Sequence, residues 1–386
     1  MSIKVLNGDC LEVLDQLPEK SVDTCITSPP YYGLRDYERE GQIGLEETPE
    51  EYVENMVEVF RKVRRVLKDE GTVWLNLGDS YASNHYTGAR DSDTGWKHGE
   101  LSQGYQARAG GAGGVFKVKD LMGIPWMVAF ALRADGWYLR QDIIWHKPNP
   151  MPESVTDRCT KAHEYIFLLS KNAKYYFDNE SIKEDAVYDK DLGILRSRKQ
   201  AELNHPSIIK RQEIGIDSTS AGDGKRNKRS VWTVTTKPFK GAHFAAFPPD
   251  LIQPCVLAGC PEKVCVECST PYERKVESKR LKRNELPKDD PRYRPNTYEG
   301  SYKDINGKAD AGYTETKDLG LEKQCQCETD ETKSGTVLDP FGGAGTTGLV
   351  ADRNDRNAIL IELNDEYAEM ARDRLYNDAP LFVDVE

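Results

Sequence analysis

The chain has 386 residues, of which 38% are hydrophobic and 30% charged, and its formal net charge is −11. This length allows a large core, and the negative charge argues against a nonspecific coat on nucleic acid. No apolar run approaches the length of a membrane span, and the start Met-Ser-Ile-Lys does not resemble a secretory signal. We therefore expect a cytoplasmic protein.

The N-terminal residues predict a strand and then a helix. The run 3–6 has the character of a strand, and Asp9 follows it within Asn7-Gly8-Asp9-Cys10. An aspartate at this point is well placed to cap a helix over 11–17.

The most informative motif follows the short apolar run 24–26, where the chain reads Ser28-Pro29-Pro30-Tyr31. Two prolines fix φ and remove backbone donors, so the carbonyl groups here can only accept hydrogen bonds. A hydroxyl and a fixed carbonyl that both accept suit a planar amine, and the tyrosine ring offers a face on which a base can stack. For these four residues alone, a Pro-Pro turn in a surface loop is the alternative.

The next segments alternate between helical and strand periodicity. Residues 83–116 are rich in glycine and polar side chains, and they predict a long loop or a disordered segment. Helices are predicted over 48–67, 120–134 and 247–259, and strands over 72–77, 137–145 and 164–170.

Positive charge is concentrated in residues 196–240, which hold eleven Lys and Arg residues against four acidic ones. Phosphate contacts made by such a stretch would give salt-dependent binding of nucleic acid. A solvated charged loop is the alternative. The candidate DNA-binding residues are Arg196, Arg198, Lys199, Lys210, Arg211, Lys225, Arg226, Lys228 and Arg229.

Two close pairs of cysteines, Cys265-x2-Cys268 and Cys325-x-Cys327, bracket a polar segment at 270–324. This segment is poor in branched aliphatic residues, so most of it cannot build a core. Four thiolates in two pairs match a tetrahedral structural zinc, which would stabilise a loop-rich insertion. In a cytosolic protein the pattern favours metal over disulfides. Free thiols are the alternative, and Cys260 is a competing ligand.

Residues 337–348 predict a buried strand, a glycine turn and the start of a helix over 346–353. Glycines let the backbone pass close to a ligand at the carboxyl end of a strand. The next strand, 358–361, ends in Glu362, where an acid normally holds a ribose diol. No lysine follows the turn, so the sequence does not predict a phosphate-binding loop of the GxxxxGK type.

The motifs Thr27-Ser-Pro-Pro-Tyr31 and Asp339-Pro-Phe-Gly-Gly-Ala-Gly345 resemble those of amino-directed DNA methyltransferases. Because the catalytic motif precedes the glycine turn, the chain resembles the beta group of that family, including bacterial and phage members. The resemblance covers roughly 3–180 and 243–376. It implies a circularly permuted, Rossmann-like α/β fold that uses S-adenosylmethionine, with a seven-stranded, mostly parallel sheet and helices on both faces.

The resemblance also implies a division of the chain. Residues 1–180 would form the catalytic half of the methyltransferase domain, and 181–242 a target-recognition region. The cofactor-binding half would combine 243–262 with 331–386, around an inserted zinc-binding polar segment at 263–330.

Roles follow from the resemblance residue by residue. The Ser28 hydroxyl and the Pro29 carbonyl would accept hydrogen bonds from the target amine, Pro30 completes the motif, and Tyr31 would stack on a base flipped out of the duplex. The residues expected at S-adenosylmethionine are Asp9, Cys10, Thr27, Phe247, Asp339, Pro340, Phe341, Gly343, Gly345, Thr346, Thr347, Glu362 and Leu363.

Serine before the two prolines is mostly associated with cytosine-N4 methylation, and aspartate with adenine-N6 methylation. We therefore expect methylation of cytosine N4 in duplex DNA, with adenine N6 as the alternative. Cys255 follows a proline, as the nucleophile for cytosine-C5 methylation usually does, but it lies in an apolar, helix-like run and is interpreted as packing.

Other classes agree less well with the two motifs. RNA or protein amino-methyltransferases usually begin the motif with Asn and have the unpermuted order, and a noncatalytic zinc-containing DNA-binding protein would need neither motif. Double-stranded DNA is the expected partner, and a cognate restriction endonuclease is a further candidate.

Overall fold

The structure is a computed structural model that describes residues 2–34, 36, 39, 41–82, 116–185, 225–236, 247–281, 288, 313–378 and 384–385. The chain divides into two compact units. The larger unit contains Met1–Asp178, Arg229–Tyr272 and Gln324–Glu386, and the smaller contains Asn179–Lys228 and Glu273–Lys323. Apart from Phe116, the loop predicted at 83–116 lies outside the described residues.

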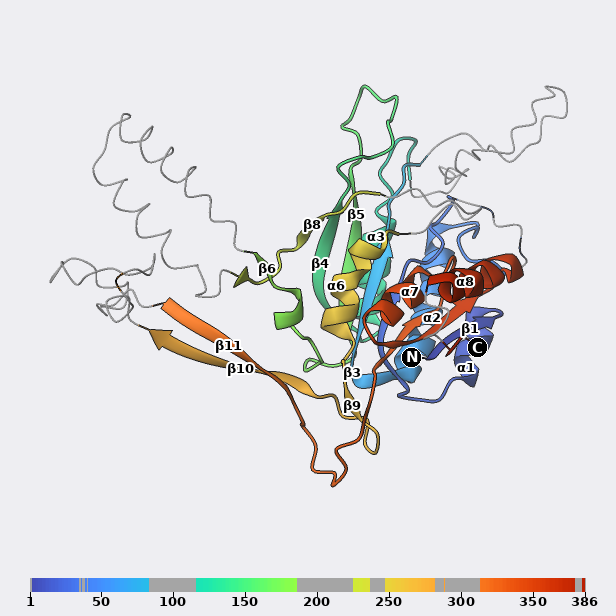
Figure 1. The fold of residues 1–386 in the computed structure, drawn as a ribbon. Helices are drawn as coiled ribbons and strands as arrows, with labels where there is room; N and C mark the ends of the chain where they lie inside the picture. Colours follow the sequence, from blue (N-terminus) through green and yellow to red (C-terminus); the bar gives the residue numbers. More distant parts are fainter. Residues whose placement is uncertain are drawn as a thin grey trace, which may run out of the picture. The chain divides into compact units, whose positions relative to one another are not determined.

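The larger unit is built on a nine-stranded sheet in the order β15-β1-β14-β13-β2-β3-β5-β4-β8 (Figure 1). Strands β15 to β3 in this order are parallel, whereas β5 is antiparallel to β3 and β4. The expected seven strands are joined by two edge strands, β8 and β15, which are too short to show a periodic pattern. The strands are β1 (Ser2–Asn7), β2 (Val22–Thr27), β3 (Leu67–Leu77), β4 (Tyr138–His146), β5 (His163–Ser170), β8 (Val231–Thr233), β13 (Thr336–Asp339), β14 (Asn357–Glu362) and β15 (Asp384–Val385).

Strands from opposite ends of the chain are neighbours in the centre of this sheet. β13 lies between β14 and β2, where Val337 pairs with Thr24 and Leu338 with Cys25. Because β13 and β2 are parallel, the segments that follow them leave the same edge of the sheet. The Ser28 motif and the glycine turn are thereby brought together.

Helices α1 (Cys10–Gln16), α2 (Pro49–Val66) and α3 (Ile124–Ala134) pack on one face of the sheet. α2 begins with a proline, and the hydroxyl of Thr48 accepts a hydrogen bond of 3.2 Å from the Glu51 amide. Its apolar stripe, including Met56 and Phe60, is completely buried.

α3 begins four residues later than the predicted helix over 120–134. Gly123 has left-handed backbone, with φ at 72°, so the helix cannot extend back through it. The Asp79 carboxylate accepts hydrogen bonds from the amides of Gly123 at 3.1 Å and Ile124 at 3.2 Å. Asp79 therefore caps α3, and this long-range contact is not visible in the local sequence.

Helices α6 (Pro249–Gly259), α7 (Thr346–Arg353) and α8 (Asp365–Asp378) cover the other face (Figure 1). α6 approaches the sheet closely at Gly259, where a Cβ atom would lie 2.5 Å from Trp74 Nε1 and 2.9 Å from Thr72 Oγ1. Cys255 is completely buried in this helix, as its interpretation as packing requires.

The smaller unit contains two antiparallel strand pairs, and the short β9 (Val264–Cys265) and β12 (Thr332–Lys333) form another pair in the larger unit. β6 (Glu184–Asp185) pairs with β7 (Lys225–Arg226), and β10 (Glu273–Leu281) pairs with β11 (Tyr313–Glu322). The β10–β11 pair was not predicted, because its sequence is polar. Backbone hydrogen bonds join its strands, and the described residues of the pair form no apolar core. Among the described residues, no helix combines the length and the apolarity needed to cross a membrane.

Candidate active site

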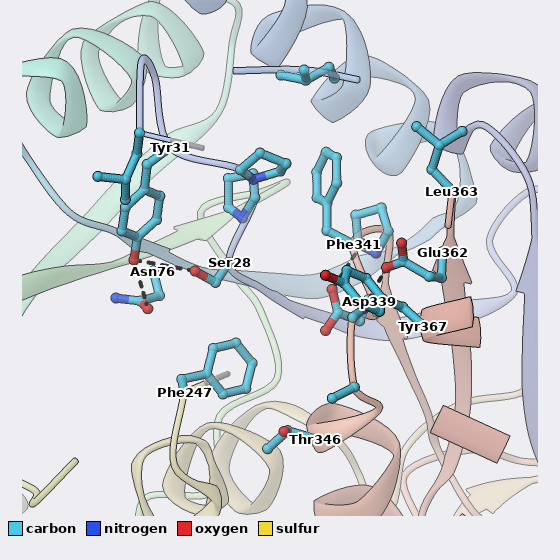
Figure 2. A pocket seen from close by; sticks show the side chains of 18 of the residues that line it. Ser28, Tyr31, Asn76, Phe247, Asp339, Phe341, Thr346, Glu362, Leu363 and Tyr367 are labelled. Carbon is cyan, nitrogen blue, oxygen red and sulfur yellow. Dashed lines mark hydrogen bonds between the residues drawn. The ribbon is translucent and has the colours of Figure 1, made fainter. Parts of the chain in front are cut away.

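A cavity of about 720 Å³ opens at the carboxyl ends of β1, β2, β13 and β14. Side chains from both halves of the chain line it (Figure 2). The predicted residues that line the cavity are Asp9, Cys10, Ser28, Pro29, Pro30, Tyr31, Phe247, Asp339, Pro340, Phe341, Gly343, Thr346, Glu362 and Leu363. Thr27, Gly345 and Thr347 do not line it and instead support its walls.

The carboxylate of Asp339 is buried beneath the glycine turn. It accepts hydrogen bonds of 2.6 Å from the hydroxyls of Thr27 and Thr347 and of 3.1 Å from the Phe341 amide. Burial raises the pKa of Asp339 to about 6, although these hydrogen bonds favour the charged form. In this arrangement Asp339 joins β2, the turn and α7.

Glu362 holds the turn from the neighbouring strand. Its two carboxylate oxygens accept hydrogen bonds from the Gly343 amide at 2.7 Å and the Asn364 amide at 2.9 Å. Burial raises the pKa of Glu362 above its usual value. Each oxygen has a second lone pair, so the carboxylate can still accept hydrogen bonds from the two hydroxyls of a ribose.

The next part of the cavity wall begins at the end of β1, the neighbour of β14 in the sheet, where the Gly8 amide donates to the Glu362 carbonyl over 2.9 Å. Asp9 caps α1, because its carboxylate accepts a hydrogen bond of 2.7 Å from the Leu11 amide. Burial raises the pKa of the neighbouring Cys10 thiol to about 12, so this cysteine is protonated at neutral pH. The Asp9 cap confirms the expected local structure, while its contact with a cofactor stays a prediction.

Hydrogen bonds hold the Ser28 motif within itself and against α2. The Ser28 hydroxyl donates to the Tyr31 hydroxyl over 3.3 Å, and the completely buried Tyr52 donates to the Pro30 carbonyl over 2.9 Å. Burial, with a contribution from Glu164, raises the pKa of Tyr31 well above its usual value. The motif is therefore a fixed part of the cavity wall.

Sequence reasoning missed four polar residues around this motif: Tyr52, Asn76, Lys147 and Glu164. The Tyr31 hydroxyl lies 3.2 Å from Asn76 Oδ1 and 2.9 Å from Glu164 Oε2 (Figure 2 shows the contact with Asn76). Lys147 forms an ion pair with the other oxygen of Glu164. A signal did exist, since Asn76 is the polar residue of an otherwise apolar strand end and Glu164 opens another core strand.

The four cysteines of the predicted metal site come together in the larger unit. Their Sγ atoms, from Cys265, Cys268, Cys325 and Cys327, all lie within 4.8 Å of one another. Thiolates around a tetrahedral zinc, each about 2.3 Å from the metal, would be spaced on this scale. Cys260 is completely buried and does not belong to the group, so the structure does not support it as a competing ligand.

Most of the predicted DNA-binding residues cannot be placed. Arg196, Arg198, Lys199, Lys210 and Arg211 lie outside the described residues. Lys225 and Arg226 form β7, followed by Lys228 and Arg229, and the Arg226 guanidinium pairs with Glu184 at 2.8 Å. Their contact with phosphate stays a prediction.

The sheet, the glycine turn and the cavity at the strand ends define an α/β protein built to bind a nucleotide-like cofactor. The sequence profile of the DNA methylase family matches residues 22–266 and 321–373. Over 374 residues the chain is 38% identical to the Type II methyltransferase M.SmaI of Serratia marcescens, covering 97% of this chain and 91% of that protein. It is 37% identical to M.Cfr9I of Citrobacter freundii, covering 97% and 88%. The chain belongs to the DNA methylase family.

The fold agrees with that of a solved structure. The PvuII DNA methyltransferase, described as cytosine-N4-specific, aligns with a TM-score of 0.51 and 16% identity, covering 100% of this chain and 96% of that one. At this level of identity the likeness concerns the fold alone, and it confirms the predicted methyltransferase architecture.

Proposed function

We propose that this protein transfers a methyl group from S-adenosylmethionine to the N4 amine of a cytosine in duplex DNA, at a short defined sequence. One observation carries the proposal: the Ser28 motif and the glycine turn, which are more than 300 residues apart in the chain, line the same cavity. A methyl donor and an acceptor amine bound at these two places would meet directly.

The cofactor half of the cavity suits S-adenosylmethionine. The volume of about 720 Å³ is within the range of small-molecule sites. Glu362 supplies acceptors for the ribose hydroxyls, Phe341 supplies an apolar face, and Asp9 supplies a further carboxylate at the wall. When bound, the cofactor would supply an electrophilic methyl group.

The other half of the cavity suits a flipped base, because an exocyclic amine is out of reach inside the duplex. Ser28 and the backbone of Pro29 would accept the two amine hydrogens and direct the nitrogen lone pair towards the methyl group. The neutral serine favours cytosine N4 over adenine N6, as the resemblance implies. The named relatives are Type II methyltransferases, which supports action at a specific sequence and a cognate endonuclease as a partner.

A transfer assay with radiolabelled S-adenosylmethionine tests the proposal. We expect labelling of duplex DNA but not RNA, with the rate in Ser28→Ala lower by about 10²- to 10³-fold because one preorganised acceptor is lost. Unchanged S-adenosylmethionine affinity in Ser28→Ala would be the control for folding. Labelling of RNA alone, or full activity in Ser28→Ala, would contradict the proposal.

We also propose that Cys265, Cys268, Cys325 and Cys327 hold a structural zinc ion. Hydrogen bonds with Thr270, including one of 3.2 Å between Cys268 Sγ and Thr270 Oγ1, lower the pKa of Cys268 to about 6, whereas the neighbouring thiols and burial raise the pKa values of Cys325 and Cys327. The proximity of the four thiols supports the proposal, since zinc binds them as thiolates.

Elemental analysis of freshly purified, reduced protein tests the metal site. About one zinc per chain is expected, and the Cys265→Ser/Cys327→Ser variant should lose it. Cys159→Ser is a matched control, because Cys159 is exposed and does not belong to the group. Absence of zinc from the unaltered protein, or full zinc content in the double variant, would refute the site.

A further inference from the structure

A chain of hydrogen bonds leads away from the proposed acceptor serine to a carboxylate on another strand. The Ser28 hydroxyl donates to the Tyr31 hydroxyl over 3.3 Å, and the Tyr31 hydroxyl donates to Glu164 Oε2 over 2.9 Å. Both donors point towards the carboxylate, so the lone pairs of the Ser28 oxygen stay available on the side of the cavity. Glu164 lies in β5, 133 residues beyond Tyr31 in the sequence.

The surroundings fix this chain of groups. Gly78 leaves room for the tyrosine ring, since a Cβ there would lie 2.6 Å from Tyr31 Cε2 and 3.4 Å from the Glu164 carboxyl carbon. Lys147 pairs with the second oxygen of Glu164, and the side chains of Lys147 and Glu164 are only 19% and 16% exposed. This ion pair holds the carboxylate at the end of the chain of hydrogen bonds in place.

We propose that Glu164 is a positioning residue that acts on the target amine through Tyr31 and Ser28, and that it is the final acceptor of the proton released by methylation. This inference rests on the proposed function. Through Tyr31 and Ser28, the negative charge of Glu164 would act on the amine. An aspartate in place of Ser28 would act on the amine directly.

The proton transfer balances without a further reactant. The target nitrogen forms a bond to the methyl carbon as the bond from methyl to sulfur breaks, and the electron pair of that bond returns to the sulfonium sulfur. The methylated nitrogen then carries a positive charge and gives one proton to Ser28. The Ser28 proton passes to Tyr31, and the Tyr31 proton passes to the Glu164 carboxylate.

The raised pKa of Tyr31 bears on how the protons move. Burial and the nearby Glu164 charge disfavour a free tyrosinate, so the phenol keeps its proton and can donate continuously to Glu164. The protons therefore move together rather than through an ionised tyrosine. Tyr31→Phe, which retains the ring and removes only the hydroxyl, should interrupt the transfer.

Single-turnover methylation rates test this proposal. Glu164→Gln and Tyr31→Phe should each lower the rate by about 10²-fold or more while leaving S-adenosylmethionine affinity unchanged. The double variant should lose little beyond the larger single loss, because the two groups act in one chain. Glu153→Gln is the matched control, since this carboxylate pairs with Arg158 at 2.6 Å and does not line the cavity. It should keep the normal rate.

A second background separates this role from a structural one. If Glu164 serves Ser28, then replacing Ser28 with aspartate should make Glu164 dispensable, so adding Glu164→Gln to Ser28→Asp should cost under about tenfold. The proposal would be overturned if Glu164→Gln caused an equal loss in the unaltered and Ser28→Asp backgrounds. Additive losses in the Glu164→Gln/Tyr31→Phe variant, or full activity in Tyr31→Phe, would also overturn it. Failure of the unaltered protein to methylate DNA would instead refute the proposed function on which it rests.

Discussion

Two carboxylates, the buried Asp339 and the half-buried Glu362, give the glycine turn its shape. Both accept hydrogen bonds from backbone amides of the turn, and Asp339 also binds two threonine hydroxyls from separate elements. Burial disfavours their charged forms, so keeping these two carboxylates at the turn lowers the stability of the folded protein. A carboxylate that only supported the fold could be replaced more cheaply by an apolar side chain.

At the residue scale, we predict that Glu362→Ala and Gly343→Val each weaken S-adenosylmethionine binding by about tenfold or more. The first removes the ribose acceptor and the partner of the Gly343 amide. The second places a β-branched side chain at a φ of 49°, where such residues are strained. Calorimetric titration measures both affinities.

Asp365→Ala, in the first turn of α8 and outside the cavity lining, is the control for that titration. Unchanged affinity in both variants would show that the cofactor lies elsewhere.

Sequence patterns identified the residues of the two motifs but not the residues that contact these motifs in the fold. The Ser28 motif and the glycine turn are local strings with a recognisable order. Glu164 and Tyr52 meet the motif only through the fold, 133 residues from Tyr31 and 22 residues from Pro30 respectively. The sequence singles out Glu164 as an acidic residue in a core strand, but it does not show which residue the carboxylate contacts.

At the scale of elements, α6 depends on a glycine to lie against the sheet. Gly259 faces Trp74, Thr72 and Thr24, all of which would be within 3.0 Å of an added Cβ. We predict that Gly259→Ala lowers the free energy of unfolding by about 1–3 kcal/mol, because the packed side chains must shift to admit the methyl group. Urea denaturation measures the change.

Gln253→Ala is the matched control in the same helix, since Gln253 is exposed. It should change the free energy of unfolding by less than about 0.5 kcal/mol. Equal stability of Gly259→Ala and the unaltered protein would mean that the contact between α6 and the sheet is looser than described.

The elements with strong periodicity were predicted closely, and α7 was predicted with its observed bounds, Thr346–Arg353. The errors lie where long-range contacts or backbone pairing decide the outcome. α3 starts late because Asp79 caps it across 44 residues, and the β10–β11 pair forms without an apolar pattern. Neither signal is present in local periodicity.

At the scale of the whole molecule, a net charge of −11 must be reconciled with a polyanionic substrate. We expect the DNA contacts on the basic stretch 196–240, where eleven positive residues stand against four acidic ones. We predict that removing Lys225, Lys228 and Arg229 together weakens DNA binding and flattens its dependence on salt, by about 0.9 in logarithmic slope for each lost phosphate contact.

Substitution of Arg274, Lys275 and Lys279 is the control, because it removes the same charge from β10. Arg274 and Lys275 pair there with Asp318 and Glu322. Titrations at several salt concentrations compare the two triple variants. Equal effects would show that only net charge matters, which would contradict a specific role for the basic stretch.

Identification of the modified nucleoside shows whether the protein methylates cytosine N4 through the Ser28 motif. DNA treated with the protein and S-adenosylmethionine is digested to nucleosides, which are separated and identified by mass spectrometry. We predict N4-methylcytosine, at a level at least about 10²-fold lower with Ser28→Ala in reactions of equal time. N6-methyladenine as the sole product would contradict the cytosine assignment, and DNA without any methylated base would contradict the proposed activity itself.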